Sequence, residues 1–288
     1  MLSKIFKITL SLLLVFFQNI AYSKTFDEKN VKNYFSALIS LEKNKSIESL
    51  KYFNSSKELK ESHPSYIKKY VFSLVLGEKV GKAIREVKMT KDKKFIDFFE
   101  SHLLLVLDGI VKNDYKKSLY YINSLKRHEK EGTFDFIVSS FLEDYIYLFK
   151  DKKIKSSLDS QFGKIGLINR TLQNCYLGHS NTESLFENLI NYEEESNSRY
   201  LFFYANYLIS KNNNSKAKDI FNDVNPINST LLVAQGKKLI DEGNYKDFKN
   251  IFSCQNSSDI IGEFFFIISN LYSSEGEIEK SNFYFNLS

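Results

Sequence analysis

Apolar residues along this chain come in pairs of runs with helical spacing, separated by short polar turns. The clearest pair lies between Tyr200 and Phe221. One run is centred on Ala205 and the other on Ala217, and the polar segment Lys211–Ser215 separates them. Apolar positions that recur every three to four residues form one face of an α-helix. We therefore predict two short helices joined by a tight turn, with a small residue on each helix where the two cross.

Seven further stretches show the same pattern. Their predicted first and second helices are 31–41 and 47–53, 66–76 and 80–87, 95–111 and 115–125, 134–149 and 154–162, 165–177 and 184–190, 231–240 and 245–252, and 260–272 and 278–287. The second helices carry marker positions at Ser49, Ala83, Ser118, Ser157, Ser184, Ala217, Phe248 and Ser281. The markers recur about every 33 residues, a period typical of stacked helical repeats, in which neighbouring hairpins bury a continuous core.

Composition agrees with an all-α fold. The chain has only two prolines, Pro64 and Pro226, and 11 glycines among 288 residues, too few for the turns of a sheet protein. Apolar residues make up 43% and charged residues 26%, which are the usual values for a folded chain. We predict an all-α α-solenoid of about eight helix-turn-helix repeats over residues 24–288.

The repeat resembles the tetratricopeptide repeat. Its period, its small pairs twelve residues apart and the turns at 113–115 (Asn-Asp-Tyr) and 243–245 (Gly-Asn-Tyr) carry the resemblance, which covers most of residues 28–288. The first-helix tryptophan of that family is absent, because the chain has no Trp, and Sel1-like repeats are similar as well. The resemblance implies a right-handed superhelix and a binding scaffold of the kind that bacteria export.

Residues 1–23 are predicted to be a secretory signal peptide. Lys4 and Lys7 precede the apolar run Ile8–Ile20, and the small residues Ala21 and Ser23 follow it. The run is too short and too polar at its end for a good membrane span. We expect cleavage near Ser23 and a periplasmic or secreted protein; the alternative is an uncleaved signal that anchors the chain.

Cys175 and Cys254 are the only cysteines. A secreted fold that depends on disulfides usually has more of them. In a linear stack the two residues fall two repeats apart, roughly 20 Å at helix-packing distances. A disulfide needs Cα atoms within about 7 Å. We therefore predict two packed, free thiols and no disulfide.

Residue patterns for catalysis or metal binding are lacking. The four histidines are His63, His102, His128 and His179, and no two stand four apart on a helix as metal ligands often do. The chain has no glycine-rich phosphate loop with its following Lys-Ser/Thr and no nucleophile elbow. We predict no enzyme activity, no cofactor and no metal site.

Charge is concentrated in one stretch. Without Lys4 and Lys7 of the predicted signal peptide, the chain has 38 basic and 35 acidic residues, a net charge of +3, which is too small to indicate nucleic-acid binding. Between Lys79 and Lys130, however, thirteen Lys or Arg stand against seven Asp or Glu, a net charge of +6. Lys82, Arg85 and Lys88 form a stripe on one predicted helix. The stripe is either a solvated outer face or a surface for an anionic membrane or polymer.

We predict a scaffold that holds a protein or an extended peptide. In tetratricopeptide-type arrays the residue after the first small position faces the concave groove. That column contains Leu38, Phe72, Leu107 and Ile146, followed by Gln173, Asn206, Lys237 and Asn270. The apolar half is expected to pack internally. We predict that the polar half binds the partner, because amides both donate and accept hydrogen bonds; the alternative is that these four are solvated helix positions.

The C-terminal edge is expected to associate with another surface. Repeat arrays need a polar terminal cap, whereas the last predicted helix carries apolar residues at Ile278, Phe283, Tyr284, Phe285 and Leu287. We therefore expect docking on a second copy or on another protein. Two other functions remain open: a membrane-surface adaptor retained by its signal, and an accessory domain of an envelope enzyme complex.

Overall fold

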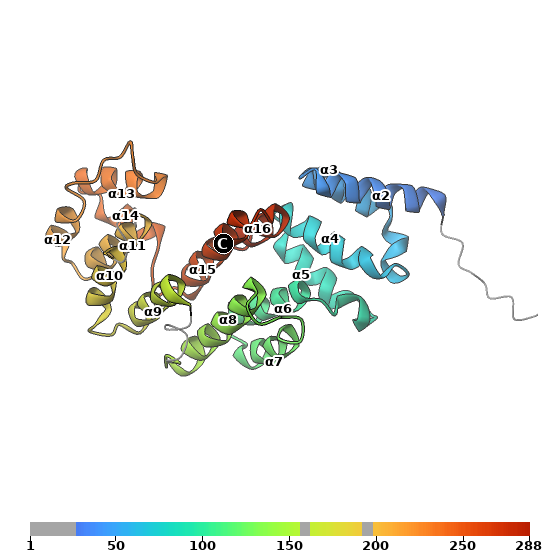
Figure 1. The fold of residues 1–288 in the computed structure, drawn as a ribbon, viewed down its shortest axis with the longest axis horizontal. Helices are drawn as coiled ribbons and strands as arrows, with labels where there is room; N and C mark the ends of the chain where they lie inside the picture. Colours follow the sequence, from blue (N-terminus) through green and yellow to red (C-terminus); the bar gives the residue numbers. More distant parts are fainter. Residues whose placement is uncertain (1–26, 156–161, 192–197) are drawn as a thin grey trace, which may run out of the picture.

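A computed structural model describes residues 27–155, 162–191 and 198–288 of the chain (Figure 1). These residues form fifteen α-helices and two short 3-10 helices, and no strand occurs among them. The predicted all-α class is confirmed. The predicted signal peptide, 1–23, lies outside the described residues. Within the described part of the chain, no helix is long and apolar enough to cross a membrane.

Most helices pair into hairpins at the predicted places. The helices are α2 (Glu28–Glu42), α3 (Ser46–Ser55), α4 (Pro64–Leu76), α5 (Val80–Met89), α6 (Phe99–Val111), α7 (Tyr115–Leu125), α8 (Phe134–Asp151), α9 (Gly163–Leu177), α10 (Thr182–Ile190), α11 (Ser198–Ser210), α12 (Asn214–Asp219), α13 (Leu231–Asp241), α14 (Tyr245–Ile251), α15 (Ser257–Ser274) and α16 (Ile278–Phe285). The 3-10 helices are η1 (Lys57–Glu61) and η2 (Lys93–Ile96). All but α8 form consecutive hairpins.

The fourth predicted hairpin is the exception. Its first helix is α8, but residues 153–155, at the start of the predicted second helix, are not helical. The Ser157 marker lies outside the described residues, and α9 begins at Gly163. The predicted second helix, 154–162, is therefore wrong at residues 154–155 and 162, which are the part of it that the structure describes.

The turns between paired helices share one backbone geometry. After α6, Asn113 has a φ of 56°, its N–H donates to the Ile110 carbonyl, and the Asp114 N–H donates to the Gly109 carbonyl at 2.8 Å. This pair of bonds is a Schellman motif, which satisfies the last carbonyls of a helix and favours Asn or Gly at the left-handed position. Left-handed residues also follow the first helices at Asn44, Glu78, Asn212, Gly243 and Gly276.

Small residues twelve apart mark the helix crossings, as predicted. The buried Ser49 hydroxyl donates to the Ala37 carbonyl at 2.9 Å. In the α15–α16 hairpin the hydroxyls of Ser269 and Ser281 lie 3.2 Å apart. Serine can replace alanine at these crossings because its hydroxyl finds a partner on the facing helix, so no buried polar group is left unsatisfied.

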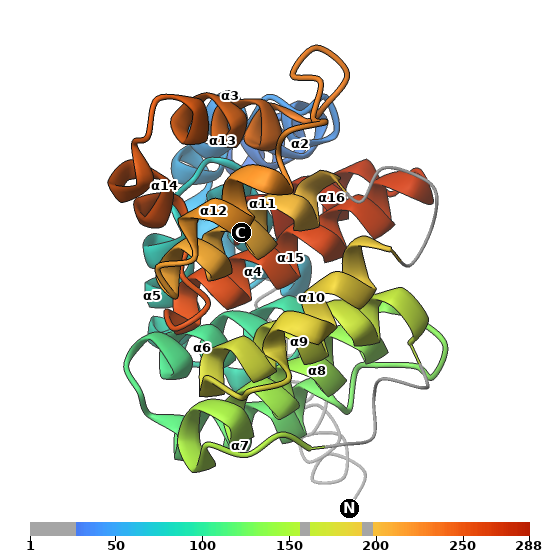
Figure 2. The same ribbon diagram turned by 90° about the vertical axis from the view of Figure 1, so that its left-hand side faces the viewer.

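The last hairpin departs from a linear stack. Helix α15 contacts α8 and α9, and α16 contacts α4, so the chain returns to its own N-terminal half. The Phe264 ring lies 5.8 Å from the Phe141 ring, and Phe283 lies 4.7 Å from Phe72. In Figure 2 the red hairpin lies at mid-height, with α6 to α10 below it and α2, α3 and α13 above. Repeats in an open solenoid contact only their neighbours, so here the last hairpin closes the array on itself.

Cys175 and Cys254 form a disulfide, which contradicts the predicted pair of free thiols. Their Cα atoms are 5.8 Å apart. The prediction assumed a linear stack, in which the two residues would be far apart. Because α15 packs on α9, the segment just before α15 carries Cys254 onto Cys175.

The apolar C-terminal edge is largely covered by the chain itself. Phe283 and Tyr284 are fully buried, and Glu279 lies 3.5 Å from the Lys69 ammonium group on α4. Phe285 and Ile278 remain 56% and 47% exposed. Self-association through this edge stays a prediction, and it would have to use these two exposed side chains.

Candidate functional site

The four predicted groove residues do not share one open surface. Gln173 and Asn206 are buried, and the Asn206 side chain donates to the Phe248 carbonyl at 3.2 Å. Lys237 forms an ion pair with Asp241 at 2.9 Å, and Asn270 is exposed. The two buried amides are used for internal packing in this structure. A partner-binding role for the four residues stays a prediction.

The apolar half of the predicted column packs internally, as expected. Phe72 contacts Phe283, and Ile146 is fully buried. Leu107 lines a cavity of about 250 Å³ together with Phe265 of α15 and Leu287 beyond α16. The chain's own last hairpin therefore packs against these apolar residues of the N-terminal hairpins.

An open pocket of about 470 Å³ lies between α5, η2, α6 and α7. Its walls combine apolar, aromatic, polar and mostly cationic side chains: Val87, Lys88, Lys93, Lys94, Ile96, Asp97, His102, Leu105, Tyr120, Tyr121, Ser124 and Arg127. Four of these residues are cationic and one is a carboxylate. The basic stretch recognised in the sequence thus folds into a concave site.

Local hydrogen bonds fix the backbone around Asp97. The Asp92 carboxylate accepts from the Lys94 N–H at 3.0 Å and so begins η2. The Ser101 hydroxyl donates to the Phe98 carbonyl at 2.7 Å at the start of α6. Asp97 lies between these two caps, which hold it at the mouth of the pocket.

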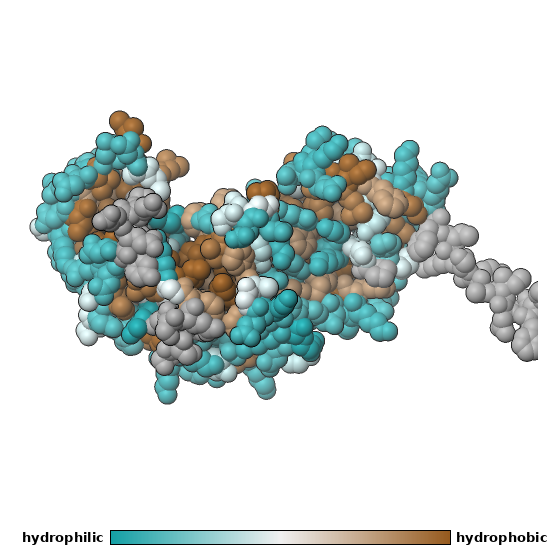
Figure 3. Space-filling view, viewed as in Figure 1, coloured by the Kyte–Doolittle hydropathy of each residue, from teal (hydrophilic) through white to brown (hydrophobic). Residues whose placement is uncertain are grey.

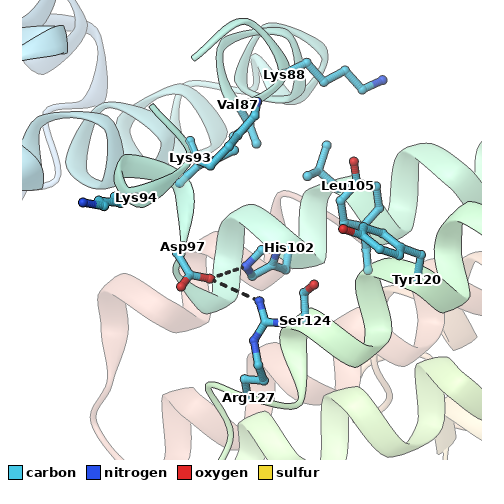
Figure 4. Close-up of a pocket in the computed structure, with 12 residues that line it drawn as sticks. Val87, Lys88, Lys93, Lys94, Asp97, His102, Leu105, Tyr120, Ser124 and Arg127 are labelled. Atoms are coloured by element: carbon cyan, nitrogen blue, oxygen red, sulfur yellow. Dashed lines mark hydrogen bonds and ion pairs between the residues drawn. The ribbon is translucent and has the colours of Figure 1, made fainter. Parts of the chain in front are cut away.

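A cluster of Asp97, His102 and His128 lies at one end of this pocket. The Asp97 Oδ1 atom is 2.9 Å from Nε2 of His102 and 2.9 Å from Nε2 of His128. The two imidazole rings stack with centroids 5.4 Å apart. Arg127 Nη2 lies 3.6 Å from the same oxygen. Figure 4 shows Asp97, His102 and Arg127 converging, whereas Lys88 and Lys94 extend outward at the rim.

The search for ligand pairs on one helix missed this cluster. His102 lies in the first turn of α6, and His128 follows the end of α7. In an antiparallel hairpin, the start of the first helix lies beside the end of the second. The sequence signal was therefore the placement of the two histidines on either side of the predicted turn at 112–114.

Electrostatics set the protonation states of the cluster. Hydrogen bonds from His102 and His128 lower the pKa of Asp97 to about 2. Burial lowers the pKa of His102, and this effect outweighs the opposing bond to Asp97. At neutral pH, Asp97 is an anion and His102 is a neutral imidazole. The His102 Nδ1 atom is buried and has no hydrogen-bond partner among the described residues.

The predicted stripe of Lys82, Arg85 and Lys88 is not a uniform charged face. Lys82 lies over the Tyr70 ring at 5.8 Å, and Lys88 pairs with the Asp108 carboxylate. Arg85 is exposed. Positive charge instead remains at the pocket rim, where Lys93 and Lys94 make no ion pair with any carboxylate in the described part of the chain.

A second pocket, of about 450 Å³, lies between α11, α13, α14 and α15. Figure 3 shows apolar residues in the hollow between the left-hand group of helices, which includes α11 to α14, and the centre of the molecule. Within the pocket, Arg199 donates to the buried carboxylate of Glu263 at 2.9 Å and stacks over the Phe266 ring at 3.7 Å. The charges of Arg199 and Glu263 neutralise each other, so the walls of the pocket are mainly apolar.

Comparison with models of protein families, with curated proteins and with solved structures finds no match for this chain. The likeness to tetratricopeptide repeats therefore rests on the chain's own turns, crossings and period. The function is therefore inferred from the geometry of the two pockets and from the packing of the last hairpin on α4, α8 and α9.

Proposed function

We propose that this chain is an exported, tetratricopeptide-like α-solenoid scaffold that binds an acidic segment of a partner protein and carries out no chemistry of its own. The segment would occupy the pocket between α5, η2, α6 and α7. The observation that carries the proposal is the charge of that pocket: Lys93, Lys94 and Arg127 outnumber its one carboxylate, Asp97, while the fourth lining cation, Lys88, is paired with Asp108. The helical hairpins with their repeated turns support the scaffold class.

The chemistry of the pocket fits a glutamate- or aspartate-rich peptide. Arg127 is 63% exposed and can offer the two parallel N–H donors that a carboxylate prefers. Lys93 and Lys94 at the rim would attract the segment from a distance. Tyr120 and Leu105 supply apolar walls for neighbouring side chains.

A peptide suits this site better than a membrane surface does. A concave pocket of about 470 Å³ can enclose a side chain and its neighbours. A flat anionic bilayer would meet only the rim. The stripe of Lys82, Arg85 and Lys88 was the candidate for a membrane surface, but one of its three charges, Lys88, forms an ion pair with Asp108.

Export has support from the disulfide. Disulfides persist in oxidising compartments such as the periplasm or the extracellular space. The Cys175–Cys254 bridge is therefore consistent with cleavage near Ser23 and with a periplasmic or secreted location.

Peptide binding can be measured directly by fluorescence anisotropy. The mature chain, in a metal chelator, is titrated against a labelled Glu-rich peptide and a Lys-rich peptide of the same length. We expect binding of the acidic peptide only, weakening with added salt because exposed charges are screened. Arg127→Met should reduce affinity about tenfold, the value of one charge-assisted hydrogen bond.

Lys238→Met is the matched control, since Lys238 is 74% exposed on α13, outside the pocket. It should bind like the wild type. Equal affinities for wild type and Arg127→Met would refute the pocket as the binding site. If anionic vesicles bind and the acidic peptide does not, the membrane-adaptor alternative replaces the proposal. If Asn270→Ala alone weakens peptide binding, the predicted groove is the site instead.

A further inference from the structure

We propose that Asp97, His102 and His128 form a binding site for a divalent transition-metal ion, with Zn²⁺ as the fitting example. The ligands would be the two imidazole Nε2 atoms and the Asp97 Oδ1 atom. The inference goes beyond the peptide-binding proposal and does not depend on it, because it concerns only the protein and the ion.

The three ligand atoms already lie close together. Each Nε2 atom lies 2.9 Å from Oδ1, and all three atoms lie within 4.8 Å of one another. Zinc bonds to nitrogen and oxygen are about 2.0–2.2 Å, so tetrahedral ligands lie roughly 3.3 Å apart. For zinc to enter, the two Nε2–Oδ1 contacts would each open by about 0.4 Å, and the two Nε2 atoms, which lie within 4.8 Å of each other, would approach by up to about 1.5 Å. The two imidazole rings are stacked, with their planes 22° apart.

The ligands are held by three separate elements. Asp97 lies between η2 and α6, and His102 is on α6 itself. His128 follows α7, where its N–H donates to the Leu125 carbonyl at 3.0 Å. Because backbone hydrogen bonds fix all three positions, an ion would meet a largely preformed site.

The ligand types favour a transition metal over calcium or magnesium. Imidazole nitrogen suits zinc, copper, iron and nickel, whereas Ca²⁺ and Mg²⁺ prefer sites made of oxygen alone. Three protein ligands would leave a coordination position open, and the cluster lies on the wall of an open pocket. Two His and one carboxylate with an open position is a pattern of reactive and ligand-binding metal sites.

Arg127 opposes the ion. Its guanidinium is 3.6 Å from the same Asp97 oxygen, so it repels a dication that binds there. Removing this charge should therefore tighten metal binding. The same change should weaken acidic-peptide binding, so Arg127→Met has opposite expected effects on the two proposals.

The test uses the full mature chain without an affinity tag, after its metals have been removed with a chelator. Co²⁺ binding is followed by visible absorption, and Zn²⁺ binding by titration calorimetry. We expect one site per chain. His128→Ala and Asp97→Asn should each abolish the cobalt spectrum and weaken zinc binding at least tenfold, and Arg127→Met should strengthen it.

His179→Ala is the matched control, because His179 is exposed and lies far along the chain, at the end of α9. It should keep the wild-type spectrum. Both ligand variants change partly exposed side chains, and circular dichroism checks their fold. The absence of a cobalt spectrum from the wild type, or an unchanged spectrum in His128→Ala and Asp97→Asn, would overturn the proposal. Peptide binding is measured in the presence of a chelator. A failure to bind the acidic peptide would therefore not affect the outcome of the metal titration.

Discussion

Reducing the Cys175–Cys254 disulfide should strongly destabilise this protein. The bridge joins residues 79 apart in sequence and ties α9 to the segment that leads into α15. A cross-link stabilises a fold mainly by restricting the unfolded chain. For a loop of this length, the chain-entropy relation gives about 4.5 kcal/mol. For a chain of this size, that corresponds to a fall of roughly 8 °C in melting temperature.

The assay is urea unfolding followed by far-ultraviolet circular dichroism, with and without reductant. Reduced wild type should unfold at a lower urea concentration than oxidised wild type. The variant with Cys175→Ala and Cys254→Ala should match the reduced protein apart from the lost thiol packing. Its midpoint should not respond to reductant, which controls for other effects of the reagent.

Thiol titration of the denatured, unreduced protein gives a direct check. The structure predicts no reactive thiol, whereas the linear-stack interpretation of the sequence predicted two. If two thiols react and reductant leaves the unfolding midpoint of the wild type unchanged, then the placement of Cys254 beside α9 is wrong. The return of the last hairpin to α9 would then be in doubt as well.

Three further changes probe packing and charge by denaturant unfolding. Phe283→Ala should lower the free energy of unfolding by about 3–5 kcal/mol, because the Phe283 ring is fully buried against α4. Phe285→Ala is the control: Phe285 is 56% exposed, and its loss should cost less than about 0.5 kcal/mol. Equal effects would contradict the docking of α16 on α4. Gly109→Ala should cost about 1–3 kcal/mol because the new Cβ would lie 2.2 Å from a hydroxyl of the paired helix. Gly81→Ala, with open space around it, should gain about 0.5 kcal/mol; a gain in both would mean that helix propensity alone decides and that the helices do not approach closely at Gly109. Burial raises the folded pKa of Glu100 above its ordinary 4.5, so its ionisation lowers stability as pH rises above that value. Glu100→Gln should therefore be more stable than wild type at pH 7 and lose this advantage below pH 4.5; a pH-independent difference would refute the assignment.

The candidate site shows how far the sequence alone leads. Its basic character was visible in the excess of Lys and Arg between Lys79 and Lys130. The convergence of His102 and His128 on Asp97 was not recognised, because the two histidines lie 26 residues apart on different helices. Antiparallel pairing of α6 and α7 is what brings the start of one beside the end of the other.

The last hairpin offered a similar signal. The segment 264–268 reads Phe-Phe-Phe-Ile-Ile, which is apolar around nearly the whole helix. A helix that is apolar on all sides belongs in the middle of a protein, not at the end of a stack. In the structure, α15 is buried against α8 and α9, as that composition requires.

The sequence by itself determined the local units of this protein. These units have three local signals: the helical period, Asn or Gly at the turns, and small residues at the helix crossings. All three act within one repeat of about 33 residues, so a single sequence is enough to recognise them. Tertiary structure alone decided where α15 and α16 pack, and with them the Cys175–Cys254 bridge. The physical reason is that burial of an apolar helix face is not directional: the same face gains about as much against the end of the array as against its concave side. Only the combined shape of α4, α8 and α9 selects between the two.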